Sequence, residues 1–283
     1  MKTTKIGMLA VMAMAASATL AQAAVAPYSQ DFQAIGAGGA LPGETIGSVS
    51  SPTTNTWTTT VDGGGNHAYQ STLVSGTGGG KGMSTLNFSN LGPATPSSHF
   101  EMSVIVTPST ASNAAVNYTE GLWFLANSGT STNDSYVADL NISAANGGRI
   151  RLVEFTGATA VVYPSSTQSL QPQLTGFALG KSYLLDVVGN YDASSVLTIN
   201  FTASEVGNSA NSQTVTLVDS SPRTGQNFGM YASGGSGGGG TQVATFDNLT
   251  VAPEPASLTL LGFGGTLLFL RKRGRRGNPT GQA

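Results

Sequence analysis

Short apolar runs alternate with polar turn clusters along most of the chain. The runs have four to nine residues, are rich in Val, Ile, Thr, Tyr and Phe, and are separated by Gly, Asn, Asp, Ser and Pro. Runs of this length and composition are typical of β-strands joined by turns, and no useful helical period interrupts them between the two ends. The pattern predicts strands at residues 100–107, 119–126, 136–142, 149–155, 160–163, 183–188, 196–201, 213–218, 228–232 and 243–251.

The number of strands predicts one all-β domain over residues 24–252. Ten or more strands in this length fit a single β-sandwich of the jelly-roll type. Residues 233–240, Ser-Gly-Gly-Ser-Gly-Gly-Gly-Gly, have the composition of a flexible linker. Only one strand follows them, and one strand cannot form a domain, so we expect a hairpin loop there.

The N-terminal 23 residues have the three parts of a secretory signal peptide. Lys2 and Lys5 precede an apolar stretch over residues 6–20, and the small residues Ala21 and Ala23 follow at positions −3 and −1 of a cleavage site. The segment predicts export by the Sec machinery and removal by signal peptidase.

The C-terminus carries a second membrane-directed segment. Pro253, Glu254 and Pro255 precede an uncharged run over residues 258–270, which would reach about 20 Å as a helix against a hydrocarbon core of about 30 Å. This length predicts a transient inner-membrane anchor. Positive charges after it hold that end in the cytoplasm and leave the domain outside. They are Arg271, Lys272, Arg273, Arg275 and Arg276.

The Pro-Glu-Pro motif, the apolar run and the basic cluster together resemble the PEP-CTERM sorting signal over residues 253–276. This resemblance implies a Gram-negative bacterium that makes exopolysaccharide, and recognition and cleavage of the tail near Pro253 to Pro255 by exosortase. It also implies a final place at the cell surface or in the extracellular matrix. Residues 277–283 form a short tail beyond the basic cluster, where the family usually stops sooner.

Composition narrows the partners of the domain between these signals. Residues 24–252 contain 13 acidic and five basic side chains, a net charge of about −8, and the chain has no Cys. An acidic, sparsely charged domain argues against binding nucleic acid or anionic lipid. The lack of Cys excludes disulfides and thiolate chemistry. Neutral glycans and peptides remain as partners.

The domain also resembles laminin-G-like and concanavalin-like sandwiches. The resemblance rests on an entry strand with Asp31 and Phe32, a Gly-rich turn before Lys81, a Gly-x-x-Tyr-x-x-Asp arrangement over residues 180–186 and a closing strand over residues 245–251. It implies that the first and last strands lie together. That fold carries lectins, carbohydrate-binding modules and glycosidases, so it does not choose among them.

Hydrolytic chemistry has little support in the residue pattern. Glycoside cleavage needs two carboxyl groups about 5–9.5 Å apart, but the candidates stand alone on separate predicted strands, and no laminarinase-type Glu-x-Asp-x-x-Glu pattern is present. His67 and His99 lack a Gly-x-Ser-x-Gly partner. The carboxylate candidates are Glu120, Asp139, Glu154 and Asp186.

Two kinds of binding residue remain as candidates. Calcium prefers oxygen ligands. Asp134 and Asp139 lie in or beside one polar loop, while Asp31 and Asp247 would meet if the terminal strands pair.

Sugars stack on exposed aromatic rings beside polar groups. Trp123, within an apolar run, is expected in the core. The aromatic candidates in polar surroundings are Trp57, Tyr69, Tyr136 and Tyr191.

The sequence therefore predicts an exported, exosortase-processed protein whose β-sandwich associates with exopolysaccharide without catalysis. Two alternatives stay open: a secreted glycan-active hydrolase or lyase with dispersed carboxylates, and a structural or adhesive protein that contacts other proteins. A structural calcium ion is the one candidate cofactor.

Overall fold

The structure is a computed structural model that describes residues 28–35, 38, 45–48, 54–61, 65–75, 80–87, 99–113, 116–127, 133–143, 147–157, 159–234 and 239–253. These residues form strands, turns and one short 3₁₀ helix, Gln168–Leu170. None of the described helices is long and apolar enough to cross a membrane. The predicted signal peptide and the sorting tail after Pro253 lie outside the described residues.

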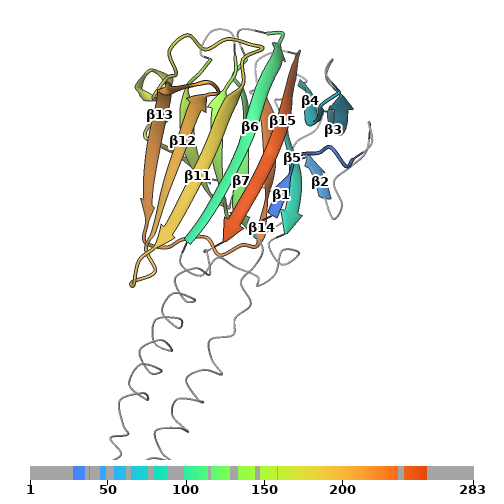
Figure 1. The fold of residues 1–283 in the computed structure, drawn as a ribbon. Helices are drawn as coiled ribbons and strands as arrows, with labels where there is room; N and C mark the ends of the chain where they lie inside the picture. The colour runs from blue at the N-terminus through green and yellow to red at the C-terminus, as the bar shows by residue number, and fades with distance from the viewer. Residues whose placement is uncertain are drawn as a thin grey trace, which may run out of the picture. The chain divides into compact units, whose positions relative to one another are not determined.

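The first of two antiparallel sheets has eight strands and forms one layer of a sandwich (Figure 1). Its order is β13-β12-β11-β6-β15-β4-β3, and β1 also pairs with β15. The bounds are β1 Tyr28–Gln30, β3 Thr54–Val61, β4 His67–Ser75, β6 His99–Ala111, β11 Tyr183–Tyr191, β12 Leu197–Glu205, β13 Asn208–Asp219 and β15 Gly240–Pro253.

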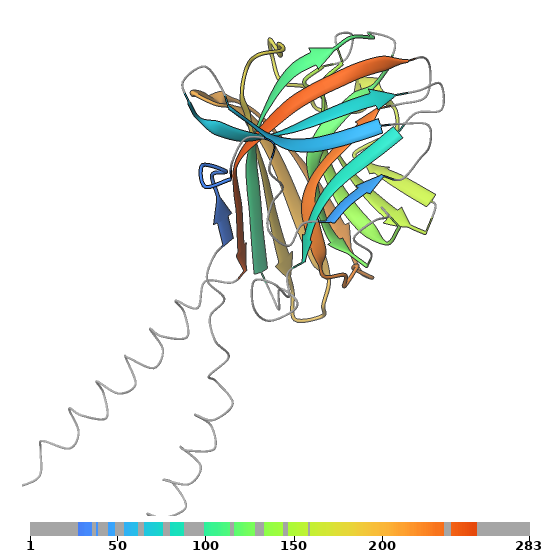
Figure 2. The same ribbon diagram turned by 90° about the vertical axis from the view of Figure 1, so that its right-hand side faces the viewer.

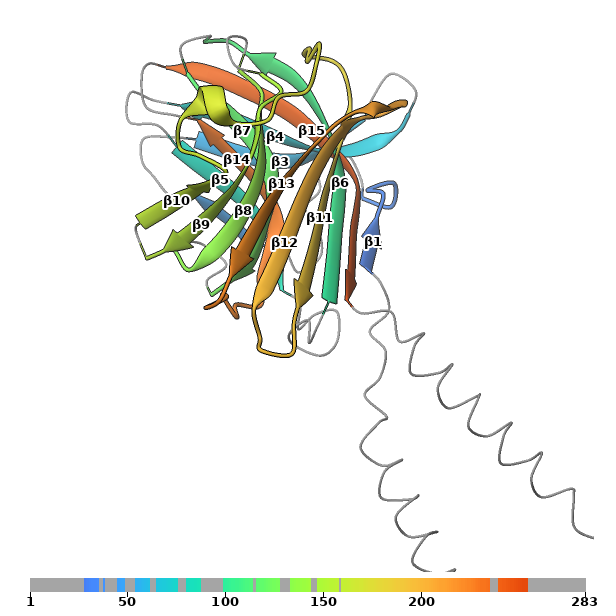
Figure 3. The same cartoon turned by 90° about the vertical axis from the view of Figure 1, so that its left-hand side faces the viewer.

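The second sheet has seven strands in the order β10-β9-β8-β7-β14-β5-β2. Figure 3 shows the two sheets facing each other as two layers. The bounds are β2 Thr45–Ser48, β5 Gly80–Asn87, β7 Tyr118–Ala126, β8 Ser135–Asn141, β9 Ile150–Thr156, β10 Thr159–Tyr163 and β14 Asn227–Gly234.

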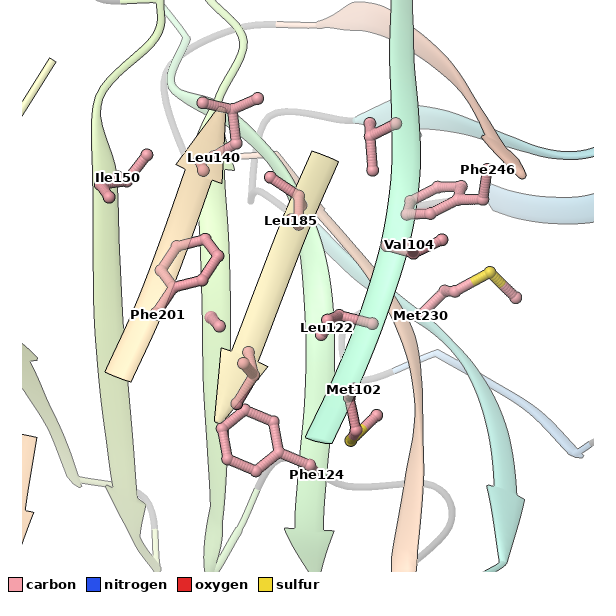
Figure 4. Close-up of a cluster of buried hydrophobic side chains, with 14 of the residues drawn as sticks. Met102, Val104, Leu122, Phe124, Leu140, Ile150, Leu185, Phe201, Met230 and Phe246 are labelled. Atoms are coloured by element: carbon pink, nitrogen blue, oxygen red, sulfur yellow. The ribbon is translucent and has the colours of Figure 1, made fainter. Parts of the chain in front are cut away.

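The main core fills the space between the sheets. Strand alternation sends every second side chain inward. Met102, Val104 and Phe201 of the first sheet therefore meet Leu122 and Phe124 of the second, all fully buried (Figure 4). The all-β, two-sheet architecture predicted from the strand pattern is thus confirmed.

The first and last strands of the domain pair, as the fold resemblance implied. Tyr28 of β1 lies opposite Val251 of β15, and Pro253, the first residue of the predicted sorting motif, lies opposite Phe100 of β6. Figure 2 shows β1, in blue, beside the end of β15. The chain therefore enters and leaves the sandwich on neighbouring strands.

Two parts of the sequence interpretation need correction. All ten predicted strands are present. The predicted entry strand corresponds to β1, which ends at Gln30, before Asp31 and Phe32, whereas β2, β3, β4 and β5 are not predicted. Residues 54–61, Thr-Asn-Thr-Trp-Thr-Thr-Thr-Val, contain only two apolar side chains and so give little strand signal. The segment over residues 233–240 is not a hairpin loop, because β14 belongs to the second sheet and β15 to the first. It connects the two layers.

Candidate ligand-binding site

The outer face of the second sheet has an apolar cluster of its own, separate from the main core. Inward residues of β7 such as Leu122 and Phe124 belong to the main core, whereas Trp123 between them points to the opposite face. Trp123 is buried as expected, but in this outer cluster. The members of the cluster are Trp123, Ala126, Val137, Val153, Phe155 and Tyr231.

A cavity of about 200 Å³ opens beside this cluster. Its apolar walls come from three adjacent strands, β8, β9 and β10: Val137, Val153, Phe155, Ala160 and Val162. Drug-sized ligands occupy pockets of about 300–1,000 Å³, so this volume suits a small compact group.

An ion pair forms the polar side of the cavity. Asp139 of β8 lies directly opposite Arg151 of β9 in the sheet register. Arg151 donates from Nε to Asp139 Oδ1 at 2.7 Å and from Nη2 to Asp139 Oδ2 at 3.0 Å. The Asp139 side chain is 1% exposed and that of Arg151 is 29% exposed, so the guanidinium is the part that reaches solvent. The nearby carboxylate raises the pKa of Arg151 above its ordinary value, which keeps it charged.

Tyr231 and Ser233 of β14 complete the polar lining. Tyr231 pairs across the sheet with Gly121 of β7, and Gly121 pairs with Asp139 of β8. The backbones of Tyr231 and Asp139 are therefore two strand spacings, about 10 Å, apart. Gly121 has no room for a side chain, since a Cβ there would lie 2.0 Å from the carbonyl oxygen of Ala138. Burial raises the pKa of Tyr231, and a side-chain hydrogen bond with Ser233 partly offsets this shift, so the phenol stays neutral at physiological pH.

The chemistry available in the cavity is binding through hydrogen bonds against an apolar wall. It contains one guanidinium that is paired through Nε and Nη2 with the Asp139 carboxylate, one neutral phenol and one hydroxyl. The indole Nε1 of Trp123, in the adjoining cluster, is also a buried donor without a hydrogen-bond partner among the described residues. Of the polar residues that line the cavity, the sequence indicates Asp139 as a candidate functional residue, but it gives no such indication for Arg151, Tyr231 or Ser233.

Three of the four aromatic residues predicted to contact glycan are wrong candidates. Trp57, Tyr69 and Tyr136 are buried in the main core, so they cannot offer a ring face to a sugar. Trp57 stacks on Tyr69 with ring centroids 5.8 Å apart, and the Tyr136 hydroxyl donates to Asp219. Tyr191 is partly buried against the same core, and its role in binding glycan stays a prediction.

The four candidate catalytic carboxylates are dispersed. Glu120 lies between the sheets, where Ser71 of the opposite sheet donates to it, whereas Asp139 is on the outer face of the second sheet. Glu154 pairs with Arg223 at 2.5 Å, and Asp186 pairs across the first sheet with Ser103. No two of the four share a site in this arrangement.

The two histidines are also held by other partners. His67 Nδ1 lies 2.7 Å from the carbonyl oxygen of Ile35. His99 contacts Asn190 Oδ1 at 2.7 Å through Nδ1 and Glu101 Oε1 at 3.0 Å through Nε2. Neither arrangement includes a serine nucleophile.

The calcium candidates at the terminal strands come near each other, but through amide side chains. Gln33 Nε2 donates to Asn66 Oδ1 at 2.5 Å, its backbone nitrogen donates to Asp31, and Asn66 Nδ2 donates to Asp247 Oδ2 at 3.3 Å. These carboxylates already accept protein hydrogen bonds, and calcium takes six to eight oxygen ligands. The pair as arranged does not fit a calcium site.

The second pair of calcium candidates fits no better. Asp134 accepts a hydrogen bond from the backbone nitrogen of Gly157 at 3.1 Å, and both oxygens of Asp139 are bound by Arg151. As arranged, Asp139 is paired with arginine, and its role as a metal ligand stays a prediction. Across the described part of the chain, no group of three His, Cys, Asp or Glu side chains is placed to hold a metal ion.

The fold and the cavity define a two-sheet β-sandwich protein with a polar and apolar depression on one outer face. No protein-family model matches the sequence, and no curated protein matches it. Several solved structures are similar in their arrangement of strands. One is lectin II from Ulex europaeus, with a TM-score of 0.48, 10% identity and coverage of 81% of this chain and 99% of that one.

Two further solved structures are similar at the same level. A protein of unknown function from Shewanella oneidensis MR-1 has a TM-score of 0.49 and 12% identity, and the match covers 85% of this chain and 94% of that one. A marine alginate lyase from Aplysia kurodai has a TM-score of 0.42 and 9% identity, with coverage of 72% and 91%. Likenesses this distant carry no information about a ligand of this chain.

Proposed function

We propose that this chain is an exported surface or matrix protein, sorted and processed by exosortase, whose sandwich binds saccharide without catalysis. The cavity on the outer face of the second sheet carries the binding part of the proposal. It combines an apolar wall with Arg151, Tyr231 and Ser233, which supply donors and acceptors at its polar side.

A saccharide suits this combination because its ring offers apolar C–H faces and hydroxyls that both donate and accept. The apolar walls can pack against the ring, while the phenol, the serine hydroxyl and Arg151 Nη1 pair with hydroxyls. A volume of about 200 Å³ is suited to one such ring or the end of a chain. The dispersed carboxylates favour binding over cleavage, which needs two of them at one bond.

The sorting part rests on the sequence signals at the two ends, and the position of β15 agrees with it. The last paired residue of the sandwich is Pro253. Cleavage of the tail beyond that residue would leave every described strand intact, so the released domain would keep its fold.

Blocking the cavity tests the binding proposal. Ala160 lies on the outer face of the edge strand β10 and lines the cavity, so Ala160→Trp fills it from the rim. Val161 is the matched control, because it is the next residue on the same strand, its side chain points to the opposite face and it is 43% exposed.

The full-length chain, purified in mild detergent, is applied to a glycan array together with the two variants. We expect the wild type and Val161→Trp to bind the same glycans, Ala160→Trp to lose that binding, and none of the three to shorten the glycans. Binding of no glycan, or equal binding by Ala160→Trp, would refute the binding proposal, and glycan shortening would refute its non-catalytic part.

A further inference from the structure

We infer that the Asp139–Arg151 pair makes the cavity selective for uncharged saccharides and excludes those that carry a carboxylate. This inference rests on the proposed function and concerns the chemical class of ligand at the same cavity. It follows from the neutralisation of the Arg151 charge by Asp139.

Arginine recognises a carboxylate through two parallel N–H donors, which match the two carboxylate oxygens. In this cavity the fork made by Nε and Nη2 is bound by Asp139 at 2.7 and 3.0 Å. Two donors on Nη1 and one on Nη2 are not used by Asp139 and can still serve as hydrogen-bond donors. An incoming carboxylate could meet these donors end-on, but the positive charge that would hold it is already neutralised by Asp139.

The rest of the cavity adds no compensating charge. Its other lining side chains are apolar or, like Tyr231 and Ser233, neutral hydroxyl groups. A carboxylated sugar would lose hydration on entering and gain no cation in return, which is unfavourable. The net charge of about −8 on residues 24–252 acts in the same direction. A neutral sugar loses nothing comparable, since hydroxyls can pair with Nη1, the phenol and the serine.

The asymmetric burial of the pair gives Asp139 this role. Its side chain is 1% exposed, against 29% for Arg151, so the carboxylate lies beneath the guanidinium and holds it in place. Asp139→Asn keeps the shape of the side chain and one acceptor for Arg151, but it leaves the positive charge uncompensated at the cavity. The variant should therefore accept carboxylated sugars.

Asp134→Asn is the matched control. It removes the same charge from the same region of the chain, but Asp134 accepts from the backbone of Gly157 and does not line the cavity. Because Asp139 is buried, thermal unfolding of each variant is measured first. A second variant, Asp139→Asn combined with Arg151→Gln, removes both charges and should keep the preference for uncharged sugars.

Binding is measured on the full-length chain with matched pairs of oligosaccharides, in which a hexose such as galactose is replaced by its 6-carboxylate, galacturonate. We expect the wild type, Asp134→Asn and the double variant to bind only neutral members. Asp139→Asn should gain about tenfold or more for the acidic members, as expected when a charge-assisted hydrogen bond forms.

The other outcomes of this experiment distinguish failure of the selectivity inference from failure of the proposed function. If the wild type binds acidic members as well as neutral ones, and Ala160→Trp blocks both, the cavity binds saccharide and the inference on selectivity is wrong. The inference on selectivity is also wrong if folded Asp139→Asn gains no affinity for the acidic members, or if Asp134→Asn or the double variant gains as much affinity for them as Asp139→Asn. If the wild type binds no saccharide of either kind, the proposed function itself fails.

Discussion

Replacing Glu120 by Gln should remove a pH-dependent loss of stability. Glu120 is 0% exposed and faces the first sheet from β7. Ser71 Oγ donates to its Oε1 at 3.1 Å, and Gln242 Nε2 donates to the same oxygen, while Oε2 has no partner among the described residues. Burial raises the pKa of this carboxyl well above its ordinary value of 4.5, and the two hydrogen bonds lower it only in part.

The direction in which stability changes with pH depends on whether the folded or the unfolded state holds the Glu120 proton. Between the unfolded and the folded pKa, the folded protein binds a proton that the unfolded chain has released, so the free energy of unfolding decreases as pH rises. One group contributes at most about 1.4 kcal/mol for each pH unit in that interval. The loss begins near pH 4.5 and continues until the folded-state pKa is passed, so wild-type stability is greatest on the acid side of this window.

Urea unfolding at half-unit steps from pH 4 to pH 8 measures the effect. Glu120→Gln cannot ionise, so its free energy of unfolding, relative to the wild type, should increase with pH by about 1.4 kcal/mol per unit at first. Val218→Ala is the control, because Val218 is 63% exposed and cannot ionise, so its difference from the wild type should not vary with pH. Parallel curves for the wild type and Glu120→Gln would refute the reasoning.

Three further predictions concern packing, the ion pair and processing. Gly189→Ala should destabilise the fold by about 1–3 kcal/mol in urea unfolding, since a Cβ there would lie 2.0 Å from the ring of Phe100. Adding Phe100→Leu should recover part of the lost stability, and an unchanged stability of Gly189→Ala would contradict the packing. Arg151→Met should cost about 3–5 kcal/mol at pH 7 because it leaves Asp139 buried and unpaired, and a cost below 1 kcal/mol in thermal or urea unfolding would contradict that burial. Changing residues 253–255 to Ala-Ala-Ala should keep the exported protein membrane-held, whereas intact-mass measurement of the wild type should show loss of residues 1–23 and of the tail; an uncut tail in released wild-type protein would refute the sorting proposal.

The sequence was sufficient for the fold class because inward and outward residues alternate clearly in most strands. It is insufficient where polar neighbours in the sequence suggest that an aromatic side chain is exposed. Trp57 stands between Thr56 and Thr58, which is also what a strand with one buried face looks like, and the tryptophan is the inward residue. In a chain with 9% charged residues, hydroxyl side chains cover the outer faces, so a Thr or Ser neighbour says little about an aromatic ring.

The cavity was harder to predict, because strand order assembles it. Asp139 and Arg151 lie 12 residues apart and meet through the β8–β9 register, a pairing that adjacent strands suggest. Tyr231 lies far along the chain and arrives only because β14 is placed beside β7, and apolar periodicity does not give that order. The usable signal was Tyr231 itself, which stands between Met230 and Ala232 of the main core and must therefore face the other way.

The environments of the carboxylates connect these observations to function. Glu120 is buried with no cation beside it. Asp139 is buried and accepts two hydrogen bonds from Arg151, and Glu154 forms an ion pair with Arg223. A glycosidase needs one carboxyl that holds its proton and one that has lost it, both at the same bond. Here the group with the strongly raised pKa lies inside the core, and the carboxylate at the cavity is occupied by arginine. The proposal of binding without cleavage rests on this separation of the two properties between the two faces of one sheet.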